Sequence, residues 1–413
     1  MQQKTTLANG LRIVTQEMNS VQSVSVGLWI KTGVLSESSQ NNGISHFIEH
    51  MVFKGTHKRT AKNIAETVDS VGGHINAFTS REYTCFYVKV LHEDVELAVD
   101  ILSDMLFNSI FDHREIEKER SVVMEEINMY EDSPEDLVHD MLMETVYPEQ
   151  AMGFPILGTE KTVSVLNREG LISHLHHHYR PDNSVLSIAG RINELELIEL
   201  AKRYFGNWGS TGSSFHGSTN DLIFNPGKAA KHKDIEQMHF IIGLEAPAFG
   251  TDHMYDLFVI NNVLGGSMSS RLFQRIREEH GLAYSIYSEM ENYLESGLFM
   301  VSCSTSPQHH EQVRHLILKE LNDLLDHGIS PDEFDKARRQ LKGNYLLGME
   351  STSGCMASMG KTELLLGKVE TAERILEKLN GLRKEEVEKT MRTYLHIEEM
   401  AESVVGPLAE GNN

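Results

Sequence analysis

The sequence has few cysteines, no long hydrophobic run and no targeting segment. Its three cysteines, Cys85, Cys303 and Cys355, are far apart and form no CxxC pair, so neither a disulfide framework nor a thiolate zinc site is indicated. No stretch approaches the roughly 18 apolar residues that cross a membrane. The N-terminus has neither an apolar signal core nor an Arg/Ser-rich character. We therefore expect a soluble, cytoplasmic protein that does not associate with membranes.

Basic residues are also scarce relative to acidic ones. The 413 residues include 38 Lys and Arg against 60 Asp and Glu, so the formal net charge is −22. A surface this acidic argues against binding to nucleic acid or to anionic membranes, and it suits cationic partners such as basic peptides. The length is too great for one ordinary core, so at least two domains are expected.

The pattern of strands and helices occurs twice along the chain. Residues 74–91 are strand-like, rich in aromatic and β-branched residues, and "GLAYSIYSEMENYLESGLFMVSCS" from residue 281 follows a similar pattern. Between the two copies, residues 206–228 are rich in Gly, Ser, Thr and Asn, which is typical of a linker. We predict an α+β protein with two duplicated domains, each a mostly antiparallel sheet covered by helices. The predicted domains span residues 1–210 and 229–413, with a linker at 211–228.

Several helix ends can be predicted from local signals. Gly72-Gly73 should stop the helix that begins near residue 60. Asp112 and Glu115 have the spacing of a capping box at the start of a long helix. Ser133-Pro134 should start the next helix, because proline is favoured in the first turn.

The stretch "HFIEH", residues 46–50, is the strongest candidate for chemistry. On a helix, His46 and His50 lie about 40° apart, and Glu49 lies about 60° to the other side of His46. All three side chains therefore point into one sector. Two neutral imidazoles at this spacing suit zinc, and a carboxylate beside the metal can act as a general base. The alternative is an amphipathic helix that carries two histidines by chance, and only a third ligand on a separate element would argue against it.

A second helix offers that third ligand. Glu119 and Glu126 are seven residues apart, about 20° short of two full turns, so both carboxylates share one helical face. Glutamates arranged in this way are most often a solvated stripe. Here Glu126 could complete a His-His-Glu site, and Glu119 could support that site as an outer partner.

These motifs together resemble a known family. HxxEH is the inverted zinc signature of the inverzincins. With Glu126 following 76 positions after His50, the chain looks like the pitrilysin family of metallopeptidases, and most like the branch of mitochondrial processing peptidase and its bacterial homologues. The stretches "GGHINAFTSREYT", "YRPDNSVLSIAG" and "VLGGSMSSRLFQRIREEHGLAYSIYS" are similar to further family signatures. The resemblance covers essentially the whole chain.

The resemblance implies a role for each matching residue. His46, His50 and Glu126 would bind one Zn²⁺ per subunit, with Glu49 as the general base. Glu119 would support the site from the same helix as Glu126. Arg277 and Tyr284 would hold the substrate and polarise the scissile carbonyl, although without the family pattern Arg277 reads equally well as a surface charge and Tyr284 as an ordinary strand aromatic.

The resemblance also implies how substrate binds. Asn76, Ala77 and Phe78 would form the edge strand that pairs with an extended peptide or unfolded polypeptide. Acidic walls would favour Arg or Lys near the cleaved bond. The predicted activity is that of a processing-peptidase-like zinc metalloendopeptidase.

The predicted assembly is a dimer of identical subunits that encloses a chamber. In this family a closed chamber needs four such domains, and one chain supplies two. The site would then combine zinc ligands from one subunit with Arg277 and Tyr284 from the other. Two alternatives stay open: a non-catalytic partner subunit of the same fold, and a peptide-binding module with a structural metal. The cluster His174, His176, His177 and His178 could hold a second metal, but consecutive histidines do not converge from one helix face.

Overall fold

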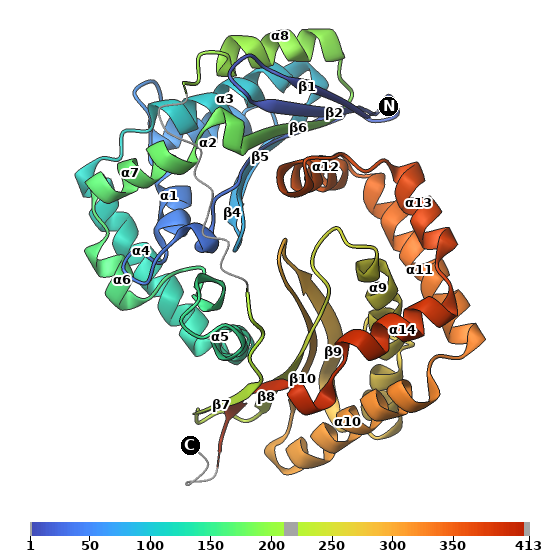
Figure 1. Cartoon of the computed structure of the whole chain (residues 1–413). Helices are drawn as coiled ribbons and strands as arrows, with labels where there is room; N and C mark the ends of the chain where they lie inside the picture. Colours follow the sequence, from blue (N-terminus) through green and yellow to red (C-terminus); the bar gives the residue numbers. More distant parts are fainter. Residues whose placement is uncertain (1, 210–221, 409–413) are drawn as a thin grey trace. The chain divides into compact units, whose positions relative to one another are not determined.

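The computed structural model describes residues 2–209 and 222–408, and its helices and strands form two compact units (Figure 1). Each unit is built on one sheet. The first unit comprises Met1–Asn128, Pro155–Thr219 and Leu346–Thr371, and the second comprises Met129–Phe154, Asn220–Tyr345 and Ala372–Asn413. Within the described ranges, no helix combines the length and apolar character needed to cross a bilayer. The cytoplasmic location stays a prediction.

The sheet of the first unit has six strands. In spatial order they are β1 (Gln2–Thr6), β2 (Arg12–Glu17), β6 (Ser184–Gly190), β3 (Ser23–Ile30), β5 (Thr84–Leu91) and β4 (His74–Thr79). Only the β2–β6 pair is parallel. Strand β4 pairs only with β5 and therefore lies at an edge of the sheet.

Helices cover one face of this sheet and enclose the first core. They are α1 (Ile44–Val52), α2 (Ala61–Asp69), α3 (Val95–Asn108), α4 (His113–Asp132), α6 (Glu160–Val165), α7 (Arg168–His178) and α8 (Glu194–Phe205). Alternate residues of β3, Val24, Val26 and Leu28, point into this core. The predicted helix ends are confirmed: α2 stops before Gly72, whose φ is +65°, and Asp112 accepts a hydrogen bond from the first turn of α4.

The sheet of the second unit repeats the arrangement of the first with five strands. In spatial order they are β7 (Gly227–His232), β11 (Ala401–Gly406), β8 (Met238–Glu245), β10 (Gly297–Thr305) and β9 (Ala283–Asn292). One pair, β7–β11, is parallel, and the β9–β10 hairpin forms one edge as β4–β5 does in the first sheet. The duplication predicted from the sequence is therefore confirmed at the level of strand order.

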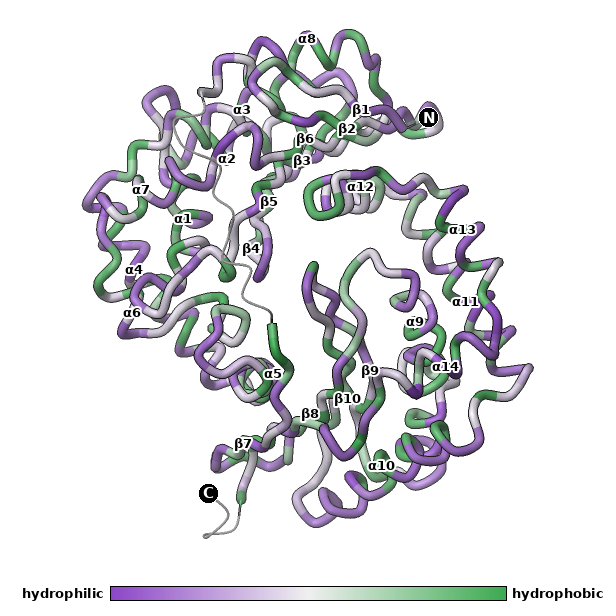
Figure 2. The backbone as a smooth tube through the Cα atoms, in the orientation of Figure 1, coloured by the Kyte–Doolittle hydropathy of each residue, from purple (hydrophilic) through white to green (hydrophobic). Residues whose placement is uncertain are grey.

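The helices of the second unit enclose its own core. They are α5 (Pro134–Val146), α9 (His253–Leu264), α10 (His310–His327), α11 (Pro331–Met349), α13 (Ala372–Gly381) and α14 (Lys384–Tyr394), together with a short π-helix (Phe273–Glu279). The tube of α10 changes repeatedly between hydrophilic and hydrophobic residues (Figure 2), as expected for a helix with one buried face. Its buried residues Val313, Ile317, Leu321 and Leu324 recur every three or four positions.

The compact units differ from the predicted domain boundaries, because two helices are exchanged between the halves of the sequence. Helix α12 (Thr352–Leu366) comes from the second half but packs on β2, β3 and β6 of the first sheet. It approaches closely, since a Cβ at Gly360 would lie 2.1 Å from Nε1 of Trp29. Helix α5 comes from the first half and packs on β8 and β11 of the second sheet, where Ser403 donates a hydrogen bond to the carbonyl of Val138.

The predicted linker, 211–228, lies largely outside the described residues. Its last two residues, Gly227 and Lys228, already belong to β7. All strands of the first sheet precede the linker, and those of the second sheet begin at its last two residues or later, so the boundary separates the sheets but not the exchanged helices.

Candidate metal centre and active site

Helix α1 carries the HFIEH stretch, and a buried carboxylate holds its N-terminus. Glu37 accepts hydrogen bonds from the backbone N–H groups of Gly43 and Ser45 at 2.7 and 2.9 Å. Burial raises the pKa of the Glu37 carboxyl group to about 7, and the hydrogen bonds from Ser45 and Gly43 oppose that rise. Gly43 has a φ of +91°, and a Cβ there would come within 2.6 Å of the carbonyl oxygen of Leu157. Glycine is therefore required at the start of this helix.

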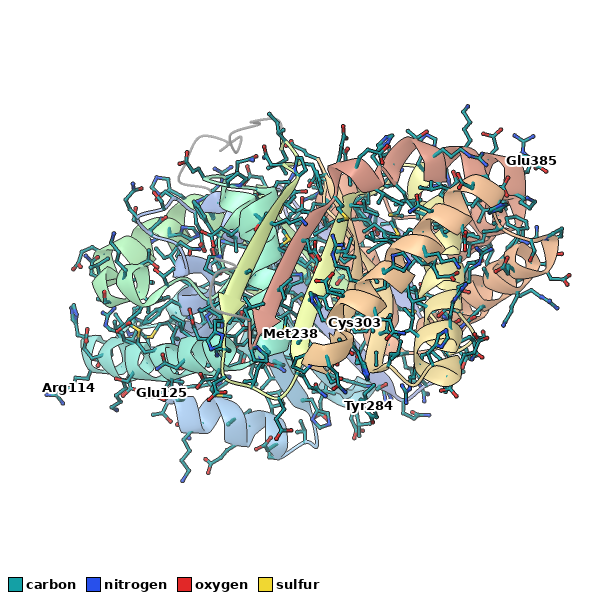
Figure 3. All side chains as sticks on the ribbon, turned by 90° about the horizontal axis from the view of Figure 1, so that it is seen from below. Arg114, Glu125, Met238, Tyr284, Cys303 and Glu385 are labelled. Atoms are coloured by element: carbon teal, nitrogen blue, oxygen red, sulfur yellow. The ribbon has the colours of Figure 1, made fainter. Side chains whose placement is uncertain are left out.

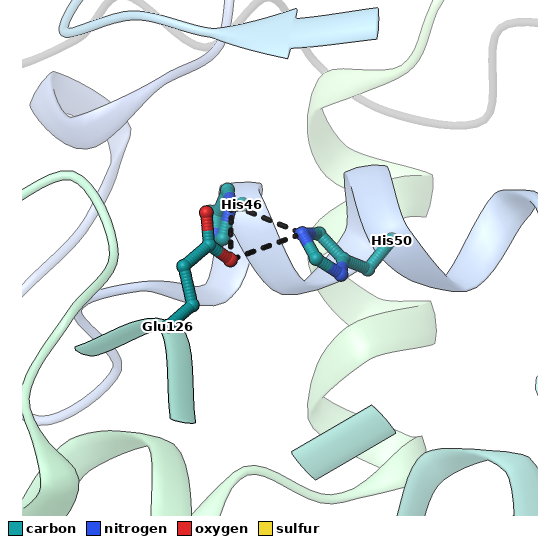
Figure 4. Close-up of side chains that lie close together, drawn as sticks. All are labelled: His46, His50 and Glu126. Atoms are coloured by element: carbon teal, nitrogen blue, oxygen red, sulfur yellow. Dashed lines mark hydrogen bonds and ion pairs between the residues drawn. The ribbon is translucent and has the colours of Figure 1, made fainter. Parts of the chain in front are cut away.

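Helix α4 lies beside α1 and brings in the distant carboxylates. His46, His50 and Glu126 converge, with one possible ligand atom from each within 4.8 Å of the others (Figure 4). The Nε2 atoms of the two histidines are 3.1 Å apart, and Oε2 of Glu126 lies 3.6 Å from His46 and 3.5 Å from His50. The structure therefore brings the three predicted metal ligands together.

The three separations fit a divalent cation. A circle through three atoms with these spacings has a radius of about 2.0 Å, which matches the 2.0–2.2 Å bonds that zinc forms to His nitrogen and carboxylate oxygen. Two nitrogens and one oxygen are also the donor set of many catalytic zinc sites, which keep a fourth position for water. The residues present therefore fit Zn²⁺.

The protonation states of the histidines suit metal binding. Burial, together with the neighbouring His50, lowers the pKa of His46 to about 3, so the imidazole is neutral. Nδ1 of His50 lies 2.8 Å from Oε1 of Glu119. A carboxylate can only accept, so Nδ1 is the donor to Glu119, and Nε2 is the ring atom that faces His46 and Glu126 as a possible metal ligand.

Glu119 is held in its ionised form. Burial alone would raise the pKa of this carboxyl group, but hydrogen bonds from His50 and Lys54 outweigh that effect and lower it. Nζ of Lys54 lies 2.5 Å from Oε2 of Glu119. The orientation of His50 is therefore fixed by a chain of two further side chains.

Glu49 lies on the same helix as the two histidines but is not one of the three converging groups. Burial raises the pKa of its carboxyl group, and a hydrogen bond from Thr79 opposes that rise. The Thr79 hydroxyl lies 2.6 Å from Oε2 of Glu49. A half-buried carboxylate with a raised pKa beside a metal site can accept a proton.

The predicted edge strand lies next to α1. Asn76, Ala77 and Phe78 belong to β4, the edge strand that follows β5 in the first sheet. Asn76 and Phe78 are exposed, and Phe78 packs edge-on against Trp29 with ring centroids 5.8 Å apart. Ala77 points to the opposite face and packs against the first core.

Arg277 and Tyr284 belong to the second unit. The Arg277 guanidinium stacks over the rings of Phe273 and Tyr284, at 4.7 and 5.0 Å from their centroids. Tyr284 is 79% exposed in the edge strand β9 (Figure 3). The two predicted substrate-binding residues are therefore brought together as a pair, on a different unit from the metal ligands.

The histidine cluster of α7 does not form a second metal centre among the described residues. His174 is buried, and its Nε2 lies 3.2 Å from the hydroxyl of Thr32. Burial lowers the pKa of His174 to about 3, so the ring is a neutral part of the packing.

Sequence reasoning missed three residues that support the site: Glu37, Lys54 and Thr79. Each acts through a contact that joins separate elements. Thr79 directly follows the proposed edge-strand residues. This position was the one feature of the sequence that could have indicated its role at the site.

A two-histidine, one-glutamate site with an adjacent carboxylate, carried by this duplicated fold, defines a metallopeptidase of the HxxEH type. Residues 12–160 match the family described as insulinase (peptidase family M16), and residues 166–341 match the peptidase M16 inactive domain. The chain belongs to peptidase family M16, the pitrilysin family of metallopeptidases.

Relatives match over nearly the whole chain. The uncharacterized zinc protease YmxG of Bacillus subtilis is 43% identical over 97% of this chain and 97% of its own. An uncharacterized zinc protease of Mycobacterium leprae is 36% identical over 98% of this chain and 92% of its own.

The fold also matches solved structures. A protease from Helicobacter pylori superposes with a TM-score of 0.93, at 20% identity, over 98% of this chain and 99% of that one. A structure described as a peptidase M16 inactive domain, from Pseudomonas fluorescens, superposes with a TM-score of 0.92, at 17% identity, over 99% and 98%.

Proposed function

We propose that the protein is a zinc metalloendopeptidase that hydrolyses peptide bonds in extended peptides or unfolded polypeptides. The observation that carries this proposal is the convergence of His46, His50 and Glu126 beside Glu49. A structural zinc normally has four protein ligands, whereas three ligands and a nearby carboxylate suit catalysis. We propose one zinc ion per subunit, bound by these three residues.

The side chains divide the chemistry among them. A bound zinc ion would polarise the scissile carbonyl and make a water molecule more acidic. Glu49 would take the proton from the attacking water and pass it to the leaving amine. Glu119 would keep the His50 ring oriented through its 2.8 Å hydrogen bond and would not touch the substrate.

Substrate would bind as an added strand on β4, through Asn76, Ala77 and Phe78. Main-chain hydrogen bonds to an edge strand do not depend on sequence, so side-chain contacts would set the preference. The net charge of −22 supports a preference for basic side chains.

We further propose a processing-peptidase-like homodimer that encloses an acidic chamber. In this arrangement Arg277 and Tyr284 of one subunit would act on substrate held at the zinc site of the other. Two features support it: only the first unit has a metal-ligand cluster among the described residues, and Arg277 stacks on an exposed Tyr284.

Hydrolysis of a basic peptide library tests the activity. The zinc-loaded protein should cleave, and both a chelator and Glu49→Gln should abolish cleavage, with one zinc still bound in the variant. Glu66→Gln, the same change on the exposed face of α2, should behave as wild type. Cleavage at the wild-type rate by Glu49→Gln would remove the assigned base, and zinc binding without any cleavage by the wild type would favour a peptide-binding module.

Mixing two inactive variants tests the composite site. If the zinc ligands and Arg277 come from different subunits, a heterodimer of Glu49→Gln and Arg277→Ala contains one intact site. Activity should then return on mixing, to roughly a quarter of wild type after random exchange. A mixture that stays inactive after verified subunit exchange would contradict the composite arrangement.

A further inference from the structure

Thr79 occupies a position that joins the edge strand to helix α1. In the β4–β5 hairpin, the N–H of Ser80 donates to the carbonyl of Tyr83. Pairs in an antiparallel ladder alternate between hydrogen-bonded and non-hydrogen-bonded. Thr79, paired with Thr84, therefore belongs to a non-hydrogen-bonded pair, and so does Ala77. Their main-chain groups point away from β5 toward the edge of the sheet, where the N–H of Ala77 donates to Oδ1 of Asn76 at 2.9 Å.

Unlike its main chain, the side chain of Thr79 points to the face of the sheet that α1 covers. Successive side chains alternate between the two faces of a strand. Ile75 and Ala77 pack against the first core, so Thr79 lies on the same face. Its hydroxyl reaches Oε2 of Glu49 at 2.6 Å. One residue thus presents its main chain to the edge and its side chain to the carboxylate.

The hydroxyl hydrogens of Thr79 and Thr84 can each be assigned to one acceptor. Thr79 has one O–H and two nearby acceptors, Oε2 of Glu49 at 2.6 Å and the hydroxyl of Thr84 at 3.4 Å. The hydroxyl of Thr84 donates to the carbonyl of Thr32 at 2.9 Å. A short bond to a carboxylate is much stronger than a long one to a neutral hydroxyl. The Thr79 hydrogen therefore goes to Glu49.

We propose that Thr79 is the positioning residue for Glu49. Its hydroxyl binds Oε2 and fixes the rotation of the carboxylate. Among the described residues, none forms a hydrogen bond to Oε1, so Oε1 is the oxygen that takes the proton from the attacking water. This inference rests on the proposed peptidase function.

The arrangement also links substrate binding to the base. A peptide paired with β4 would be held by the outward main-chain groups of Ala77 and Thr79. The side chain of the same Thr79 holds Glu49. Because one residue contacts both the peptide and the base, its geometry determines the distance between them. A displacement of about 1 Å in such a constellation can cost 100-fold in rate.

Replacing Thr79 by valine and by serine separates the hydroxyl from the methyl group. Valine keeps the shape and removes the donor, whereas serine keeps the donor and removes a methyl group. Thr15→Val is the matched control, because Thr15 is a buried strand threonine on β2, four strands away from β4 in the sheet.

For Thr79→Val we expect kcat to fall about 10- to 100-fold, with KM and zinc affinity within about twofold of wild type. Thr79→Ser should recover kcat to within about threefold, and Thr15→Val should match wild type. Wild-type kcat in Thr79→Val would overturn the proposal. So would an equal loss in the valine and serine variants, or loss of zinc from the valine variant, because either would assign Thr79 a packing role.

Crystal structures of the zinc-loaded wild type and Thr79→Val give a readout that needs no turnover. The wild type should show one Glu49 rotamer with Oε2 on Thr79, and the variant should show a rotated or split carboxylate. An unchanged Glu49 in the variant would overturn the proposal. A wild type with the ordered carboxylate but no hydrolysis would instead count against the proposed function alone.

Discussion

The contact between Glu119 and His50 predicts how strongly the site should hold zinc. Glu119 is 4% exposed and accepts from Nδ1 of His50 at 2.8 Å, while Lys54 donates to its other oxygen at 2.5 Å. Loss of such an outer partner typically costs 10- to 100-fold in metal affinity, which corresponds to about 1.4–2.8 kcal/mol.

Two substitutions at this position should give graded effects. Glu119→Gln keeps an acceptor for His50 but removes the negative charge and leaves Lys54 near the site without its counter-ion. We expect its zinc affinity to fall about 10-fold. Glu119→Ala removes both the charge and the acceptor, and its affinity should fall about 100-fold.

Competition against a chromophoric zinc chelator at fixed pH measures these affinities. Glu117→Gln is the matched control, since Glu117 lies two residues away on α4 and only pairs with Arg120 at the surface. Thermal melting of the metal-free proteins reports any loss of folding. Zinc affinity within twofold of wild type in a folded Glu119→Ala protein would refute the outer-partner role.

Three further predictions concern other parts of the chain. Ala77→Pro removes an edge N–H of β4 that donates to Oδ1 of Asn76 and that a paired peptide would take over, so the KM for long peptides should rise about tenfold without a change in zinc content; an unchanged KM would contradict edge pairing. Arg277→Lys keeps the charge but loses the planar contact with Tyr284, so kcat/KM should fall at least about tenfold, and equal activity would contradict its role. Burial alone would raise the pKa of Glu333, but hydrogen bonds, chiefly from Arg271, lower it to about 2. Its stabilisation is therefore complete above the unfolded value of 4.5 and is lost as the pH falls toward 2. It amounts to about 1 kcal/mol after allowance for solvent screening, and Glu333→Gln should be less sensitive to acid in urea unfolding near pH 3; equal sensitivity would contradict it.

Each half of the candidate metal site could be predicted from the sequence, because helical geometry relates the residues within one helix, whereas the meeting of the two helices was implied only by the family resemblance. The four-residue spacing of His46 and His50 puts both rings on one face, and the seven-residue spacing of Glu119 and Glu126 does the same on another helix. Likewise, the aromatic and β-branched residues of 74–91 predicted strand structure, which the structure shows as β4 and β5. Where the residues lie on one helix or strand, the local sequence pattern is sufficient to predict their relative positions.

Contacts between elements could not be predicted in this way. The bond from Thr79 to Glu49 depends on the register of β4 and on how α1 lies across it, and neither follows from periodicity. An amphipathic pattern shows that α5 and α12 each have an apolar face, but not which sheet that face covers. The exchange of these helices was therefore absent from the predicted domain boundaries.

That exchange has a consequence for synthesis of the protein in the cell. The hydroxyls of Ser25 and Thr352 meet at 2.9 Å although 327 positions separate them along the chain. At roughly 5–20 residues per second, the ribosome needs about 16–65 s to cover that interval. For this time the face of β3 that bears Trp29 has no covering helix. The nascent chain therefore exposes an unfinished sheet to the surrounding medium, and chaperones that shield such surfaces should raise its yield.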